Sequence, residues 1–252
     1  MYKKEFFEHS VVFSIRTFRE DDLIVKFLTP SQGMVTSFAF GGKKSRRRFP
    51  GCLEELSHVI FKVSSSKNGN YLYLQEGILI DRFSNIHKNR SLYGMAINCQ
   101  KFLDAVLIGR EDVRGIFDLY LELLKGLNNG LFNGMGNIPI FFRARVAKEL
   151  GYLPRIESCN TCGRLLSTQW EVFFSPKDGN VVCGRCASQK NGFILFKRPA
   201  FELFCASFLG SPNDWLRFKT HGEILNLVAK GIGLFVETHL GIRWDRGRFR
   251  TK

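Results

Sequence analysis

Alternating apolar and polar positions dominate the first third of the chain and predict β-strands. In residues 34–40, for example, Val35, Ser37 and Ala39 form one face of the pattern, and the residues between them form the other. Segments of turn chemistry, such as 30–33 and 67–70, separate the apolar runs. The expected strands are residues 9–18, 23–29, 34–40, 53–63 and 71–80. Five short strands in the first 80 residues favour a small barrel, with an OB-fold as the leading interpretation.

From about residue 81 the hydrophobic period lengthens to that of a helix, as Ile116, Leu119 and Leu123 illustrate. The expected helices are residues 92–108, 113–127, 141–150, 199–209 and 223–240. The predicted fold class is therefore α+β: a five-stranded OB-fold barrel, an all-helical domain and an inserted four-cysteine module. The expected domains are residues 1–80, residues 81–156 together with 191–252, and the insert at 157–190.

The spacing of four cysteines predicts a metal site. Cys159 and Cys162 form one CxxC pair, and Cys183 and Cys186 form a second pair about twenty residues later, which is the ligand set of a structural zinc site. Short β-type runs at 170–174 and 181–182 predict a hairpin that returns the second pair to the first. The alternatives are two disulfides or reduced thiols that bind nothing. Four thiolates leave no open position, so we expect one zinc ion per chain with a structural role.

A cationic loop between two expected strands is the second candidate site. Lys43, Lys44, Arg46, Arg47 and Arg48 carry the charge, and Phe49 follows them. Cations of this kind neutralise phosphates, and we expect Phe49 to offer a stacking face to a base. The alternative is a solvated basic loop without a ligand. The loop predicts nucleic-acid contact.

The charge balance supports a polyanionic partner. The formal net charge is +14 and the sequence pI is about 9.7. No apolar run reaches the roughly 18 residues of a membrane span, and charges occupy the start of the chain where a signal peptide is apolar. Seven cysteines without an export signal predict a reducing cytoplasm.

The sequence offers no obvious catalytic set, so we expect a binding protein and not an enzyme. Glu20, Asp21 and Asp22 resemble the acidic cluster of a two-metal nuclease, but without further nearby carboxylates a polar hairpin turn is favoured. In residues 243–252 arginines alternate with aromatic residues. This segment is interpreted equally well as a contact for single-stranded nucleic acid or as a frayed tail.

Several segments, in order along nearly the whole chain, resemble the bacterial RecO family of recombination mediators. Residues 16–25 resemble that family's opening hairpin, residues 42–54 its basic loop and following strand, residues 141–154 the helix before its zinc module, and residues 237–241 its closing helix. The four cysteines match the family's zinc positions. The resemblance also places Arg16 and Arg19 among the expected nucleic-acid contacts.

The resemblance implies binding of single- and double-stranded DNA, annealing without ATP, and a bacterial cytoplasmic, nucleoid-associated location. It further implies work with RecR to load RecA onto strands coated by single-strand-binding protein (SSB). The expected contacts for the acidic SSB tail are Phe142, Arg143, Arg145 and Lys148. Two other classes stay open: a zinc-bearing nuclease or nucleic-acid-modifying enzyme, and a zinc-ribbon scaffold in a transcription or ribosome complex.

Overall fold

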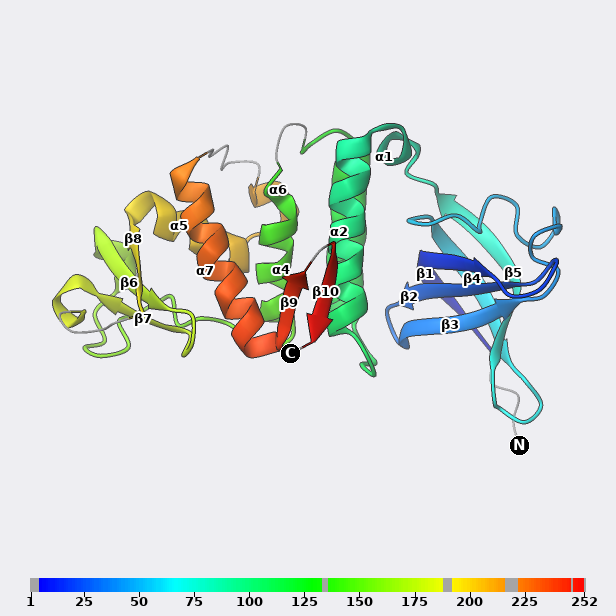
Figure 1. The fold of residues 1–252 in the computed structure, drawn as a ribbon, viewed down its shortest axis with the longest axis horizontal. Helices are drawn as coiled ribbons and strands as arrows, with labels where there is room; N and C mark the ends of the chain where they lie inside the picture. Colours follow the sequence, from blue (N-terminus) through cyan, green and yellow to red (C-terminus); the bar gives the residue numbers. More distant parts are fainter. Residues whose placement is uncertain (1–4, 133–135, 188–191, 216–221, 246, 252) are drawn as a thin grey trace. The chain divides into compact units, whose positions relative to one another are not determined.

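The computed structural model describes residues 5–132, 136–187, 192–215, 222–245 and 247–251 (Figure 1). Their contacts divide the chain into two compact units. The first unit comprises residues 1–96 and 107–130, and the second comprises 97–106 and 131–252. The three-domain division expected from the sequence stays a prediction.

Five strands of the first unit form a closed barrel in the order β1-β2-β3-β5-β4, with β1 also paired to β4. The strands are β1 Glu5–Thr17, β2 Leu23–Thr29, β3 Gly33–Ala39, β4 His58–Ser65 and β5 Leu72–Asp81. All neighbours pair antiparallel except β3 and β5, which are parallel. The expected number of strands is confirmed.

The barrel core follows from the alternation in the sequence. Residues 25, 27, 35 and 39 point inward with the β4 residues 59, 61 and 63. The rings of Phe27 and Phe61 meet there with centroids 5.1 Å apart. Residues 53–57 were expected to begin the fourth strand, but they belong to a turn segment in which Leu56 has φ 67°. A left-handed backbone interrupts a strand, so β4 begins only at His58.

The first unit also contains helices. They are α1 Ser84–Lys88, the first turns of α2 Arg90–Val106, and α3 Arg114–Asn128, of which α3 contacts strand β2 of the barrel. Tyr120 of α3 meets Phe13 of β1 edge to face, at a centroid distance of 5.8 Å. Where α3 begins, the Asp112 N–H donates to the Ser31 carbonyl at 2.9 Å, which fixes the start of the helix to the β2–β3 turn.

The second unit contains the remaining helices and two small sheets. Its helices are α4 Ile138–Glu149, α5 Arg198–Leu209, α6 Pro212–Trp215 and α7 Glu223–Leu240, with short 3-10 turns η1 Leu166–Thr168 and η2 Gly184–Cys186. One sheet has the order β7-β6-β8, from β6 Glu171–Ser175, β7 Asn180–Cys183 and β8 Ile194–Lys197; the other pairs β9 Ile242–Asp245 with β10 Arg248–Thr251. The strand β8 and the pair β9–β10 were not expected.

Phenylalanine rings form much of the core of the second unit. Phe174 of β6 lies 4.6 Å from Phe204 of α5 and 6.1 Å from Phe235 of α7, measured between ring centroids. Gly231 lets α7 come close to this sheet, because a Cβ there would lie 2.9 Å from the Phe196 ring. The sheet is therefore held by α5 and α7.

Among the described residues, none of the helices has the length and apolar character needed to cross a membrane.

Candidate nucleic-acid surface and metal centre

The four predicted cysteines come together. Their sulfur atoms lie within 4.8 Å of one another, and the Sγ atoms of Cys162 and Cys183 are 3.8 Å apart. A disulfide would need about 2.05 Å, whereas the edges of a zinc–thiolate tetrahedron with bonds of about 2.3 Å measure about 3.8 Å. All four thiols are free. The donor set and its spacing fit one tetrahedral metal ion bound by four thiolates.

Backbone hydrogen bonds shape the first CxxC turn and attach it to the β6–β7 hairpin. The Gly163 N–H donates to the Cys159 carbonyl at 2.9 Å, and Gly163 has φ +72°, which favours glycine. Asn160 pairs with Val181 of β7, since its N–H donates to the Val181 carbonyl and its Oδ1 accepts from the Val181 N–H, both at 3.0 Å. The expected hairpin thus returns one pair to the other.

The thiols differ in acidity. Burial opposes ionisation of Cys159, but hydrogen bonds from the backbone N–H groups of Cys183, Cys162 and Thr161 together lower its pKa to about 6. The backbone nitrogen of Cys183 lies 3.4 Å from the Sγ atom of Cys159. Hydrogen bonding with the neighbouring thiols, that of Cys162 foremost, raises the pKa of Cys186 to about 12. Ionisation is thus easier at Cys159 than at Cys186.

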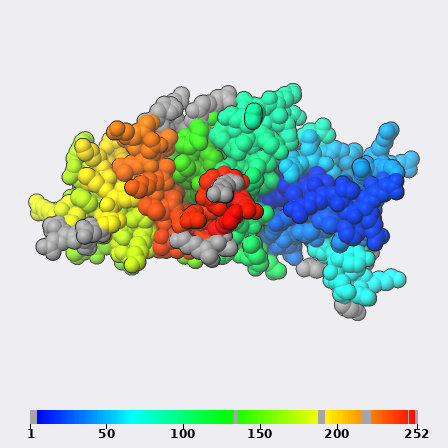
Figure 2. All heavy atoms as spheres, viewed as in Figure 1, coloured from blue at the N-terminus to red at the C-terminus, as the bar shows by residue number. Residues whose placement is uncertain are grey.

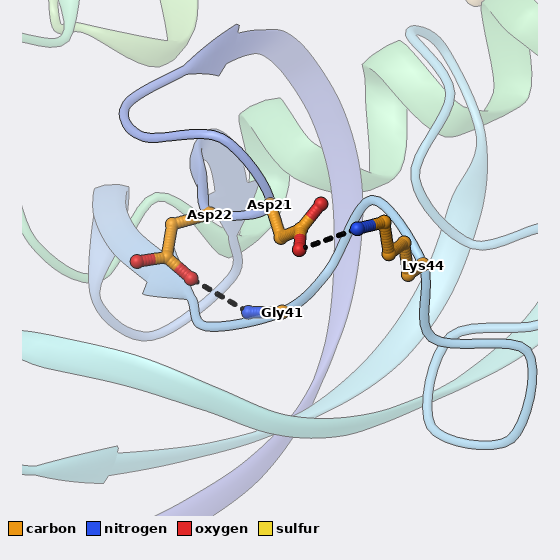
Figure 3. A network of polar contacts seen from close by, with 4 residues as sticks. All are labelled: Asp21, Asp22, Gly41 and Lys44. Atoms are coloured by element: carbon orange, nitrogen blue, oxygen red, sulfur yellow. Dashed lines mark hydrogen bonds and ion pairs between the residues drawn. The ribbon is translucent and has the colours of Figure 1, made fainter.

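Two aspartates hold the cationic loop, residues 40–57, on the barrel (Figure 3). The Gly41 N–H donates to Asp22 Oδ1 at 2.7 Å, and Lys44 Nζ lies 2.8 Å from Asp21 Oδ2. The Lys43 N–H donates to the Asp21 carbonyl at 3.1 Å. The favoured interpretation of the acidic cluster as a polar turn agrees with these contacts, because both carboxylates bind the loop.

The predicted cations of the loop lie at the surface. Lys43, Arg46 and Arg47 are exposed. Lys44 is exposed too, but it is paired with Asp21. The Arg48 guanidinium donates to the Phe40 carbonyl and lies 5.0 Å from the Phe49 ring centroid, so this side chain also has a structural contact.

Two further predicted cations lie where β1 ends. Arg16 is exposed and pairs with Ile24 across the β1–β2 ladder. Arg19 is exposed and lies over the Phe18 ring, with its Cζ 5.3 Å from the centroid. Both cations are thus available at the surface of the barrel.

The expectation that Phe49 offers a stacking face is wrong. Only 4% of Phe49 is exposed, because its ring completes the barrel core. Other aromatic side chains, which were not among the expected contacts, are exposed instead. They are Phe18, Phe40 and Tyr71, packed around the half-buried Phe38 and Tyr73. The alternating pattern of residues 34–40 already indicated that residues 38 and 40 face outward, because they lie on the face opposite the inward positions 35, 37 and 39.

The expected SSB-tail surface on α4 is also corrected in part. Phe142 and Val146 are fully buried, so neither offers an apolar face to a peptide. Arg143 donates to Asn98 Oδ1 at 2.6 Å and lies over the rings of Trp244 and Phe249, and burial lowers the pKa of its guanidinium. Arg145 pairs with Glu149 one turn on. Arg143, Arg145 and Lys148 are all half-buried.

Residues 242–251 form a hairpin in the described part of the chain, so the tail is not frayed there. Phe249 of β10 meets Phe102 of α2 at a centroid distance of 5.2 Å, and Lys101 Nζ donates to the Gly247 carbonyl at 2.9 Å. In Figure 2 these C-terminal residues, coloured red, lie at the surface beside the orange residues of α7, which β9 contacts. Both aromatic rings of the hairpin thus have structural partners.

A closed barrel with an exposed cationic loop, joined to a helical unit with a four-cysteine cluster, defines an α+β protein with a candidate metal centre. Two family descriptions match the chain: Recombination protein O N terminal over residues 5–83, and Recombination protein O C terminal over residues 87–248. The chain belongs to the RecO family.

Curated relatives match along almost the whole length. A protein of Lawsonia intracellularis named DNA repair protein RecO is 36% identical over 248 residues, covering 97% of this chain and 98% of its own. A protein of Maridesulfovibrio salexigens with the same name is 34% identical over 246 residues, covering 98% of this chain and 99% of its own. The similarity spans both units.

Proposed function

We propose that the chain is a DNA-binding mediator of recombinational repair that anneals complementary strands without ATP. The observation that carries the proposal is the cationic loop, whose basic side chains lie exposed on one side of a closed barrel. Phosphate contacts supply affinity without base specificity, which suits a protein that must act on any sequence. Family membership and the relatives named DNA repair proteins support the same role.

We further propose that the barrel is an OB-fold and that the cysteine cluster holds zinc. The strand order β1-β2-β3-β5-β4, closed by β1 pairing with β4, supports the first assignment. Four cysteine sulfur atoms within 4.8 Å of one another support the second, because soft thiolate ligands favour zinc. The zinc would join Cys159 and Cys162 to the β6–β7 hairpin and would do no chemistry.

The decisive experiment measures annealing. Complementary strands coated with SSB are mixed with purified protein without ATP, and duplex formation is followed by fluorescence. We expect annealing by the wild type and a marked decrease in an Arg46→Ala, Arg47→Ala, Arg48→Ala variant. The slope of log affinity against log salt should shrink by roughly 0.7 for each single-strand phosphate that the variant no longer neutralises. Strand cleavage that requires a divalent metal would instead establish the nuclease alternative.

The partners RecR, RecA and the SSB tail are proposed on the family resemblance. Arg143 contacts Asn98 and Arg145 pairs with Glu149, so Lys148 is the predicted cation of α4 that we test for the acidic tail. A labelled tail peptide should bind a Lys148→Glu variant at least about tenfold more weakly than the wild type, equivalent to about 1.4 kcal/mol. Lys177→Glu, at an exposed turn residue, is the matched control. Equal affinities would place the tail elsewhere.

A further inference from the structure

Five aromatic side chains form one connected cluster on the barrel. The rings of Phe38 and Phe40 are nearly parallel, at 6° and a centroid distance of 5.7 Å. Phe18 meets Phe38 edge to face at 5.1 Å, and Tyr71 meets it in the same way at 5.6 Å. Tyr73 lies 6.4 Å from Phe40. We call these five residues the aromatic cluster.

Strand register explains how residues so distant in sequence meet. Phe38 of β3 pairs with Ile24 of β2 on one side and with Tyr73 of β5 on the other. Its neighbours Ser37 and Ala39 point into the buried core, so Phe38 points outward. Phe18 follows the end of β1, and Tyr71 precedes β5 by one residue. The cluster is therefore built on the outside of the barrel.

The cluster stays open to solvent although its rings are apolar. Phe18 is 45% exposed, Phe40 39% and Tyr71 45%. Phe27 and Phe61, on the inward side of the same sheet, are fully buried. Contiguous exposed aromatic surface of this kind marks a binding site, since isolated exposed side chains need no partner but a packed group of rings does.

A hollow of about 540 Å³ adjoins the cluster, between Phe40 and the β4–β5 turn. Phe40, Tyr71 and Tyr73 supply ring faces and edges to it. Ser66, Lys67, Asn68 and Asn70 supply a cation, amides and a hydroxyl. Flat apolar walls beside hydrogen-bonding groups suit a planar, polar-edged ring, which describes a nucleobase.

Positive charge surrounds the cluster. Arg16 pairs with Ile24, which pairs with Phe38, so Arg16 lies in the same cross-strand row. Arg19 lies over Phe18, and the cationic loop begins at Phe40 itself. The two aspartates nearest the loop bind Gly41 and Lys44. The surroundings therefore suit a polyanion that carries planar rings.

We propose that the aromatic cluster stacks the unpaired bases of single-stranded DNA, while the cationic loop holds the phosphates. The inference rests on the proposed DNA-binding function and deepens it. Bases in a duplex already stack on one another and cannot lie on protein rings, so the cluster adds affinity for single strands alone. Phosphate contacts serve both forms. The cluster thereby gives the barrel its preference for the unpaired strands that annealing requires.

The test compares wild type with a Phe40→Leu, Tyr71→Leu variant on three ligands of equal length. These are oligothymidylate, a duplex, and an abasic strand that keeps its phosphates. We expect at least about tenfold weaker binding of oligothymidylate, because the variant cannot stack its bases. Binding of the duplex and of the abasic strand should not change. The salt slope should also stay the same, because no charge is removed.

Two controls address folding and specificity. Tyr71→Phe keeps the ring and should bind oligothymidylate as the wild type does. Phe7→Leu removes a ring that is 60% exposed on β1 and that Lys62 contacts at 5.1 Å, outside the cluster, and it should have no effect. Circular dichroism and thermal melting of each variant establish that the barrel is folded.

The outcomes separate this inference from the function on which it rests. Equal decreases in affinity for all three ligands would overturn the stacking role, and so would unchanged binding of oligothymidylate. In either case an Arg46→Ala, Arg47→Ala variant, which keeps the contact of Arg48 with Phe40, still decides whether the cationic loop binds DNA. A wild type that binds no DNA would overturn the proposed function itself.

Discussion

Arg143 lies over the ring of Phe249, with its guanidinium carbon 4.8 Å from the ring centroid. The contact joins α4 to the C-terminal hairpin. From their sequences, α4 was interpreted as a contact for the SSB tail and the C-terminal segment as a contact for single-stranded nucleic acid. The interaction of a cation with an aromatic face stabilises the fold most when the cation is desolvated, as the Arg143 guanidinium is. Arg143 therefore has a structural role, in contrast to Arg145 two residues later, which pairs with Glu149.

These two arginines predict unequal effects on stability. Arg143→Met should lower the free energy of unfolding by about 2 kcal/mol, because it removes both the charged hydrogen bond to Asn98 and the cation over the rings of Trp244 and Phe249. Arg145→Met should cost at most about 0.5 kcal/mol, the value of a helical i, i+4 ion pair. Urea unfolding of the two variants checks this. Equal decreases would contradict the structural role of Arg143.

The agreement between sequence and structure has a physical pattern. Strands β2 and β3 and helix α7 were predicted within a residue of their bounds, because each has a strong period and clear turn or glycine signals at its ends. The four cysteines were found because metal ligation demands a fixed spacing. These are local signals, and one segment is enough to recognise them.

The errors concern which side of the protein a residue faces. Phe49 follows five cations and was placed with them, but a turn directs its ring into the barrel. Trp244 and Phe249 belong to a hairpin that is fixed by α4 and α2, far away in sequence. Strand β8 is short, and its residues pair with β6 residues that lie 20 to 26 positions earlier in the chain. Such features depend on tertiary contacts that no local pattern encodes.

The cysteine cluster predicts one zinc ion per chain. Cys183→Ser should release the metal and destabilise the β6–β7–β8 sheet, because ligation of this kind contributes much of the folding energy of a small metal site. Cys205→Ala, a thiol of α5 outside the cluster, should keep full metal content. Elemental analysis of freshly purified protein provides the measurement. Protein prepared without chelators that holds no zinc would refute the assignment.

The ion pair between Asp21 and Lys44 predicts a gain of function. Asp21→Asn removes the carboxylate that neutralises one cation of the loop, so DNA affinity at low salt should rise severalfold and its salt dependence should steepen. Asp118→Asn makes the same change of charge at an exposed position of α3 and serves as the control. Fluorescence anisotropy with labelled single strands measures both. A gain no larger than that of the control would show that Lys44 is not a DNA contact.

The buried His58, which lies against the exposed His9, predicts how the stability of the first unit depends on pH. His58 is 5% exposed, and its Nε2 lies 2.9 Å from Nδ1 of His9. Burial, followed by the charges of His9 and Lys125, lowers the pKa of His58 to about 4, while Asp81 opposes the shift. The Phe117 ring covers it on the side of α3, with centroids 6.4 Å apart. His58 is therefore neutral in the folded protein at neutral pH.

The sign of the effect follows from linkage. In the unfolded chain His58 binds a proton below its ordinary pKa of 6.5, whereas in the folded protein it is protonated only below about pH 4. The contribution of neutral His58 to the free energy of unfolding is thus fully present above about pH 6.5. It declines as the pH falls toward 4, by at most about 3 kcal/mol. His58→Gln cannot be protonated in this range, so its stability should decrease less than that of the wild type between about pH 7.5 and about pH 5.

Urea unfolding at both pH values gives the test as a double difference. Contributions from the cysteine cluster change equally in wild type and variant, and they cancel in the comparison. If His58→Gln retains the wild-type dependence on pH, the proton that destabilises the acidified protein binds elsewhere.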